Sequence, residues 1–115
     1  MQRRKAFKVA ALLLVMVVSS ADILAQKRIR FQRGKSSATV RGPIGANGYT
    51  EYVIDGRAGQ VMTIEITSGN GAVVVNAGTA SGKSFSVEMT GGDHLLSVVN
   101  TARRATNFTL TVSIR

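Results

Sequence analysis

Two groups of cations are the side chains in this 115-residue sequence that are best suited to binding a partner. Arg103 and Arg104 are adjacent in a short polar stretch near the C-terminus. A guanidinium binds a carboxylate through two parallel hydrogen bonds and keeps its charge, so this pair suits an acidic partner. The second group crowds one short stretch: Lys27, Arg28, Arg30, Arg33 and Lys35. For both groups, a solvated basic surface that keeps the protein soluble is the alternative.

The sequence offers few residues for catalysis. A nucleophilic triad needs an imidazole beside its nucleophile, and the only histidine, His94, follows a Gly-Gly-Asp turn, where we expect an exposed or half-buried strand residue. A carboxylate mechanism needs two acids in one pocket. We place Glu65 and Glu88 on solvent-facing strand positions and Asp55 and Asp93 in turns, so no pair stands out. We therefore expect no catalytic residue and a protein that is not an enzyme.

Cofactors and nucleic acid are also disfavoured. With no cysteine and one histidine, a transition-metal site is improbable, and the acids do not cluster in one loop as calcium requires. No glycine-rich loop opens a helix to cradle a phosphate. Nucleic-acid binding would need aromatic platforms among the cations, and only Phe31 and Tyr49 lie near the basic stretch. We expect no metal, no cofactor and no nucleic-acid partner.

The N-terminal residues have the order of a secretory signal peptide. Residues 1–8 hold four cations and no acid, residues 9–18 are all apolar, and residues 19–21 are small. Ten helical residues rise about 15 Å, half of a ~30 Å hydrocarbon core, so the stretch is too short for a membrane anchor. We expect cleavage after Ala21 or Ala25 and a periplasmic or secreted bacterial protein without a membrane span.

Residues 26–115 are then expected to form one domain. They include 11 of the 15 basic and five of the six acidic residues, so the net charge falls from +9 to about +6. A positive charge of this size steers acidic partners without identifying one. Because the chain has no cysteine, the domain must be stabilised by packing and by sheet hydrogen bonds.

Beyond residue 26 the apolar side chains recur every second residue. The last segment is the clearest, since Phe108, Leu110, Val112 and Ile114 alternate with Thr and Ser. Successive side chains of a strand point to opposite faces, so this pattern predicts one buried and one solvated face. Shorter versions of it, and one apolar run, predict strands near residues 29–31, 38–40, 52–54, 62–66, 72–75, 85–89 and 95–98.

All twelve glycines follow the expected signal peptide, most of them between these segments. Glycine allows the positive φ of tight turns. Strands spaced by turns at short intervals, with no helical stretch between them, indicate an antiparallel sandwich or barrel. We predict a small antiparallel β-sandwich of about seven to eight strands.

Several segments resemble the bacterial pre-peptidase C-terminal-like domains. The similarity begins at residues 29–40, continues through residues 52–54 and 57–64 with their Ala-Gly-Gln turn, and returns at residues 91–94 and 105–112. These segments cover most of the expected domain in the right order. The resemblance implies a small antiparallel β-sandwich, in agreement with the strand pattern.

Within that family, short secreted members resembling this chain are periplasmic inhibitors of g-type lysozyme. This resemblance implies that Arg103 and Arg104 match the inhibitors' basic loop and that Tyr49 matches an aromatic residue at a sheet edge. The basic loop would enter the lysozyme cleft, pair with its carboxylates, and leave the aromatic ring in a sugar subsite. The sequence departs from the inhibitors in two respects. The middle of its chain is shorter, and it lacks their Trp before the Gly-Asp turn and their aromatic residue after that turn, where it has His94.

Three functional hypotheses follow. The first is an exported, non-catalytic binding module of the bacterial envelope whose protein or glycan partner is open. The second is a g-type lysozyme inhibitor that acts through the basic loop. The third is a carbohydrate-binding or cell-wall-binding accessory domain, for which only Tyr49 and Tyr52 are candidate platform residues, and we expect Tyr52 in the core.

Overall fold

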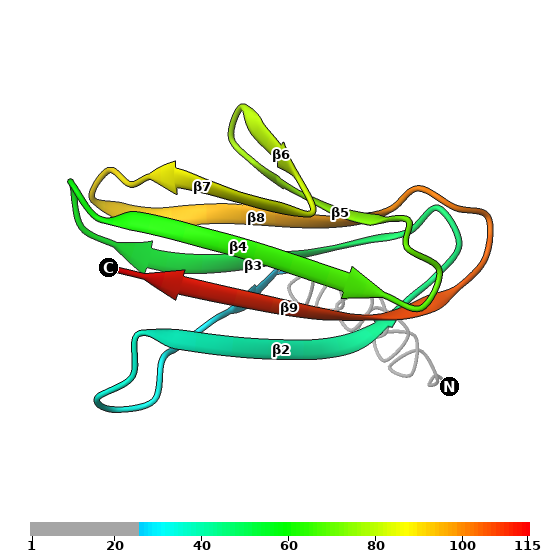
Figure 1. Ribbon diagram of the computed structural model, residues 1–115, viewed down its shortest axis with the longest axis horizontal. Helices are drawn as coiled ribbons and strands as arrows, with labels where there is room; N and C mark the ends of the chain where they lie inside the picture. The colour runs from blue at the N-terminus through cyan, green and yellow to red at the C-terminus, as the bar shows by residue number, and fades with distance from the viewer. Residues whose placement is uncertain (1–25) are drawn as a thin grey trace, which may run out of the picture.

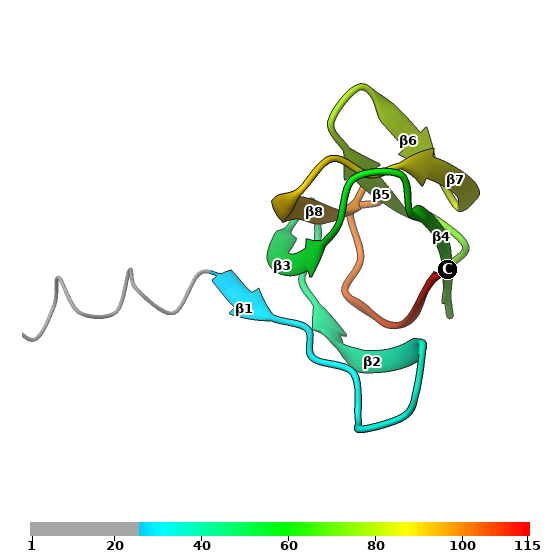
Figure 2. The same ribbon diagram turned by 90° about the vertical axis from the view of Figure 1, so that its left-hand side faces the viewer.

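The computed structural model describes residues 26–115, which form two β-sheets packed face to face (Figures 1 and 2). The five-stranded sheet has the order β1 (Gln26–Arg28), β3 (Tyr49–Gly56), β8 (Gly92–Asn100), β5 (Val73–Ala77) and β6 (Ala80–Gly82). The four-stranded sheet has the order β2 (Ser37–Ile44), β9 (Thr106–Ile114), β4 (Val61–Ser68) and β7 (Ser84–Glu88). The predicted signal peptide, residues 1–25, lies outside the described residues.

The predicted all-β sandwich is confirmed. The described residues contain nine strands and no helix, and every strand pair is antiparallel except β1 with β3. The count exceeds the expected seven to eight because β1 and β6 are three-residue strands, too short for an alternating pattern to be visible in the sequence. No described helix is long and apolar enough to cross a membrane.

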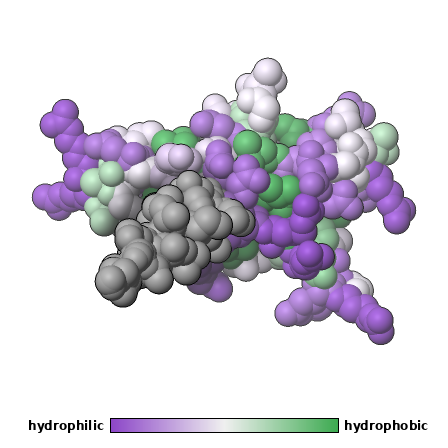
Figure 3. All heavy atoms as spheres, turned by 180° about the vertical axis from the view of Figure 1, so that it is seen from behind, coloured by the Kyte–Doolittle hydropathy of each residue, from purple (hydrophilic) through white to green (hydrophobic). Residues whose placement is uncertain are grey.

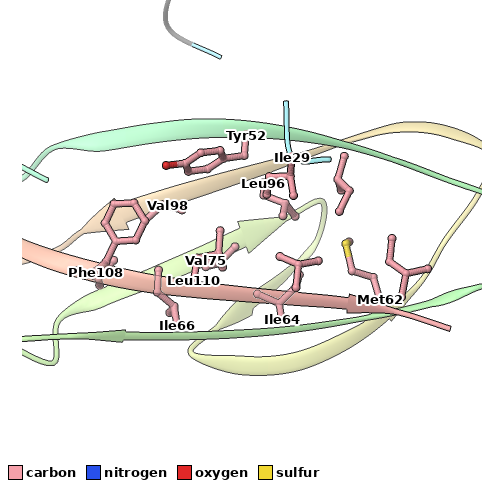
Figure 4. Close-up of a cluster of buried hydrophobic side chains, with 14 of the residues drawn as sticks. Ile29, Tyr52, Met62, Ile64, Ile66, Val75, Leu96, Val98, Phe108 and Leu110 are labelled. Atoms are coloured by element: carbon pink, nitrogen blue, oxygen red, sulfur yellow. The ribbon is translucent and has the colours of Figure 1, made fainter. Parts of the chain in front are cut away.

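The two-residue alternation builds the core between the sheets. Met62, Ile64 and Ile66 of β4 and Leu110 and Val112 of β9 point inward from the four-stranded sheet. The five-stranded sheet contributes buried Ile54. It also contributes Tyr52, Val75, Leu96 and Val98, which Figure 4 labels. Tyr52 packs edge-on against Phe108, with ring centroids 6.5 Å apart, which confirms that Tyr52 is a core residue. Burial of this tyrosine raises the pKa of its hydroxyl.

The start of the domain differs from the expected strand at residues 29–31. β1 ends at Arg28, and the chain then crosses from the five-stranded sheet to β2 in the other sheet. Ile29 is buried and Phe31 half-buried in this crossover, and both pack against the core. Alternation placed these two side chains correctly on the inside, but the crossover, rather than a strand, carries them there.

The outer faces of the two sheets are chemically unlike. The four-stranded sheet presents hydroxyls that pair across strands, Thr39 with Thr111 at 3.5 Å and Thr63 with Ser86 at 2.9 Å. The five-stranded sheet presents apolar side chains in the middle of a hydrophilic surface (Figure 3). They include exposed Leu95 and half-buried Val53, Val74 and Val99.

Candidate partner-binding site

Three loops meet at one end of the sandwich, on the right in Figure 1. Residues 45–48 connect β2 to β3, residues 69–72 connect β4 to β5, and residues 101–105 connect β8 to β9. Two backbone bonds tie the first loop to the end of β8 and to the third loop that follows it. The amide of Asn47 donates to the carbonyl of Ala102 at 2.8 Å, and the amide of Asn100 donates to the carbonyl of Gly48 at 2.9 Å.

The first loop is a tight turn closed by a hydrogen bond from the amide of Gly48 to the carbonyl of Gly45 at 3.0 Å. Asn47 has a φ of 53°, in the left-handed region, which Asn tolerates better than most residues. The turn delivers the chain into β3, whose first residue is Tyr49. Tyr49 lies opposite Val99 of β8, and 67% of its side chain is exposed.

Asn100, the last residue of β8, ties all three loops together. It is only 1% exposed. Its Nδ2 donates to the carbonyls of Gly45 and Arg104 at 2.9 and 2.8 Å. Its Oδ1 accepts from the amide of Ala102 at 3.1 Å and from Nδ2 of Asn70 at 3.4 Å. Both donors and both lone pairs of the amide are therefore used, which makes this burial of a polar side chain favourable.

The loop of residues 101–105 is also bound to the loop of residues 69–72. Thr101 donates twice to the carbonyl of Ala72, from its amide at 3.0 Å and from its hydroxyl at 2.9 Å. Asn70 in turn accepts from the amide of Ala72 at 2.9 Å. The backbone that carries Arg103 and Arg104 is thus held by hydrogen bonds from two sides.

The electrostatics of this end follow from its composition. None of the three loops contains an acid. Among the described residues the only ion pair joins Arg28 to Asp93, so neither Arg103 nor Arg104 is neutralised by this part of the chain. Both arginines are exposed. The loops therefore present two guanidiniums without an ion-pair partner in the described residues on a hydrogen-bonded backbone, and Tyr49 begins the strand that follows the first loop.

All three residues predicted as a partner site are thus placed at one end of the molecule. Asn100, the residue that joins their loops, is not among the residues predicted from the sequence. A signal for it does exist in the sequence, because Leu96, Val98 and Asn100 occupy alternate positions of one strand. A polar residue at an inward position needs buried hydrogen-bond partners, and only the fold shows that these partners come from three separate loops.

The remaining candidate residues form a different cluster, near the opposite end of β8. Asp55 and Asp93 do not lie in turns, as we expected, but face one another across β3 and β8. Arg28 of β1 reaches the same place and binds both oxygens of Asp93 at 2.9 and 2.8 Å. This contact offsets the repulsion between opposed carboxylates and lets both strands continue through them.

This carboxylate pair differs from an acid–base pair. Hydrogen bonding and attraction from Arg28 lower the pKa of Asp93, and Asp93 in turn raises the pKa of Arg28. A general acid at neutral pH needs a raised pKa, which burial would supply, whereas Asp93 is exposed. His94 is half-buried beside it and contacts the carbonyl of Thr90 at 2.9 Å through Nε2. Within residues 26–115, no three His, Asp or Glu side chains are grouped to hold a metal ion.

No protein-family model and no curated protein sequence matches this chain significantly. Solved structures do match it. PliG of Aeromonas hydrophila, a periplasmic inhibitor of g-type lysozyme, aligns with a TM-score of 0.68 at 20% identity, over 79% of this chain and 96% of PliG. The chain shares its fold. PliG of Salmonella Typhimurium aligns with a TM-score of 0.63 at 21% identity, over 78% of this chain and 97% of that one.

A third structure carries the same fold in another setting. The pre-peptidase C-terminal domain of a Bacillus anthracis collagenase aligns with a TM-score of 0.59 at 16% identity, over 78% of this chain and 94% of that domain. The fold resemblance expected from the sequence, to pre-peptidase C-terminal-like domains and to lysozyme inhibitors among them, is therefore confirmed.

Proposed function

We propose that this protein is an exported, non-catalytic binding protein of the bacterial envelope whose partner is a g-type lysozyme. The observation that carries the proposal is the loop end of the sandwich. There Arg103 and Arg104 form no ion pair within residues 26–115, their loop is anchored by Asn100, and exposed Tyr49 begins the strand that follows the neighbouring loop. The fold shared with PliG, a lysozyme inhibitor, supports the choice of partner.

The inhibition follows from the chemistry of the lysozyme cleft. A glycosidase cleaves its substrate with carboxyl groups that flank the scissile bond. A guanidinium placed between them forms charge-assisted hydrogen bonds and holds the general acid in its ionised state, in which it cannot protonate the leaving group. The ring of Tyr49 would occupy a neighbouring sugar subsite. A loop held by Asn100 loses little conformational freedom on insertion, which favours affinity.

The test is inhibition of a g-type lysozyme by the protein produced from its full-length sequence and recovered from the envelope. We expect inhibition at sub-micromolar concentration that weakens as ionic strength rises, because the contact is between charges. Inhibition that is absent at low salt would refute the proposed partner. A c-type lysozyme serves as the comparison enzyme, since it presents carboxylates in a differently shaped cleft.

Of the alternatives, the carbohydrate-binding domain has the least support. Sugar rings are bound by stacking on exposed aromatic faces, and Tyr49 is the only exposed aromatic ring among the described residues. Tyr52 is in the core. Binding of isolated peptidoglycan that survives the replacement of both Arg103 and Arg104 would favour this alternative over the inhibitor.

We further propose that residues 1–25 are a signal peptide and residues 26–115 the exported domain. The basic, apolar and small-residue order supports this, as does the packing of residues 26–115 into two sheets around a shared core. Cleavage after Ala25 would leave Gln26 as the first residue of both the mature chain and β1. N-terminal sequencing of the exported protein decides between Asp22 and Gln26, and a first residue of Met1 would contradict the proposal.

A further inference from the structure

A hollow of about 600 Å³ lies away from the loop end, between β8, β7 and the hairpin of β5 and β6. Figure 2 views the molecule from this side, with β8 and β7 flanking the hairpin. Met62 of the core, Ala77 and Val87 give the hollow an apolar lining, and Leu95 and Ser97 of β8 form one wall. A volume of this size is that of a ligand-binding cleft.

The wall on β8 is an open strand edge. Backbone groups of alternate residues in a strand point to opposite neighbours. The amide of Ile29 donates to the carbonyl of Val53 at 2.9 Å, so the odd-numbered residues of β3 face β1 and the even-numbered ones face β8. The register of β3 with β8 then directs the backbone groups of Asp93 and Leu95 away from β3, into the hollow.

No described strand meets those groups. The pairing of β5 with β8 ends at Asn76 opposite Ser97, and β5 itself ends at Ala77, where the hairpin turns away. Residues 92–96 of β8 therefore continue past Ser97, the last residue that pairs with β5, and have a paired neighbour only in β3. At about 3.4 Å per residue they offer about 17 Å of edge, enough for a strand of four or five residues.

The facing wall is also a strand edge. The amide of Ile66 donates to the carbonyl of Lys83 at 2.8 Å, so the odd-numbered residues of β7 are directed to β4. The backbone groups of Ser86 and Glu88 point the other way, and β7 is the last strand of its sheet. Unpaired edges of this kind are sites at which a further strand can add.

The charge of the residues that line the hollow indicates which kind of added strand could bind there. Among the described residues that line the hollow, none is Lys or Arg, whereas Glu88 and Asp93 are acids. Asp93 is held by Arg28, but Glu88 forms no ion pair within residues 26–115. A domain that is basic elsewhere therefore has a hollow with an apolar floor and one uncompensated carboxylate at its rim.

We propose that this hollow binds an extended peptide segment, apolar at alternate positions and basic at the others, as an added strand between β8 and β7. Its backbone pairs with Asp93 and Leu95, its apolar side chains rest on Ala77 and Val87, and its basic side chain reaches Glu88. The site is separate from the loops of the proposed lysozyme interface, so one protein can hold both partners at once.

The test uses the blocked peptide acetyl-VKVKV-amide and ¹⁵N-labelled protein produced from the full-length sequence. We expect the amide signals of Asp93 and Leu95 to shift on titration and their hydrogen exchange to slow by about tenfold at saturation, because edge pairing protects these groups. No shift at either amide with peptide at about 1 mM, the weak end of specific recognition, would overturn the proposal.

Two controls separate strand pairing from simple attraction. An analogue N-methylated at alternate residues cannot donate the pairing hydrogen bonds, and acetyl-VEVEV-amide reverses the charge. We expect both to bind at least about tenfold more weakly. Equal binding of the methylated analogue would show that no strand is added and would overturn the proposal.

Matched variants locate the charge contact. Glu88→Lys is expected to weaken the lysine peptide about fivefold, the effect of an exposed ion pair. Glu65→Lys changes the same charge on the outer face of β4, outside the hollow, and is expected to leave binding unchanged. Equal loss in both variants would assign the effect to net charge and contradict the site. Lysozyme inhibition is unaffected in either case, so the two proposals fail separately.

Discussion

The polar groups at the two ends of β8 differ in whether the described residues satisfy them with hydrogen bonds. At its C-terminal end, Asn100 is buried and the backbone of three loops is bonded to it or to one another. At its N-terminal end, the backbone groups of Asp93 and Leu95 point into a hollow where β5 has ended. The first arrangement presents side chains on a rigid base, and the second leaves backbone free to pair. The first end is therefore suited to contact through side chains, and the second to contact through the backbone.

Among the proposed changes, Asn100→Ala is expected to affect the bonded loop end most strongly. The change leaves two carbonyls, one amide and the side chain of Asn70 without their partner at a part-buried site, so we expect a loss of about 3 kcal/mol in the free energy of unfolding. Urea denaturation measures it. Hydrogen exchange should also rise in the amides of Asn47 and Ala102.

Asn76→Ala is the matched control, because Asn76 is exposed on β5. We expect this variant to unfold within about 0.5 kcal/mol of the original protein. Equal destabilisation by the two replacements would show that Asn100 has no special part in joining the loops.

Removing the charges tests the loop end without disturbing its frame. Replacing both Arg103 and Arg104 by Ala should raise the inhibition constant for g-type lysozyme by about a hundredfold, since charge pairs desolvated at an interface are strong. The free energy of unfolding should not fall, because both side chains are exposed and form no ion pair within the described part of the chain.

The control for this pair is replacement of Arg33 and Lys35 by Ala. These cations are equally exposed but lie in the crossover before β2, at the other end of the molecule (Figure 1). An equal loss of inhibition in both double variants would mean that overall charge, and not the loop, carries the contact.

A smaller effect is expected at Tyr49. Tyr49→Ala should weaken inhibition about tenfold by removing an exposed ring from the interface, and Tyr49→Phe should retain most of the affinity. Inhibition assays at constant ionic strength measure both. Full inhibition by the alanine variant would restrict the proposed site to the two arginines.

The smallest effect concerns the other end of β8. Arg28 depresses the pKa of Asp93 below its ordinary value of 3.8. The stability from this contact is therefore fully present above pH 3.8 and is lost as the pH falls through the lower pKa of the folded state. Thermal unfolding at pH 7 and near pH 2.5 should show a smaller acid-induced drop in Tm for Asp93→Asn than for the original protein. An identical drop would show that the ion pair does not couple to folding.

Alternation predicted an antiparallel sandwich or barrel and nearly all of its core, and the resemblance to pre-peptidase C-terminal-like domains implied the sandwich. Residues such as Ile64, Leu110 and Val112 are inward in the structure because a two-residue period places them on one face of a strand. The same logic failed where strands are short or where a charge intervenes. Asp55 and Asp93 were predicted in turns because Asp is favoured in turns and unfavourable in strands. No local pattern shows that Arg28, which is distant in the sequence, binds Asp93 opposite Asp55.

The sequence by itself determined the fold class, the buried face of each long strand, and the candidate residues Tyr49, Arg103 and Arg104, because these depend on side-chain type and on spacing along one segment. The tertiary structure decided which loops meet, what holds them together, and where a strand edge stays open. Those features depend on hydrogen bonds between residues far apart in the chain, as in Asn100 with Gly45, and on the point at which β5 leaves β8. The residue types and spacing within one segment cannot predict these contacts, because each contact depends on a second segment that is distant in the sequence.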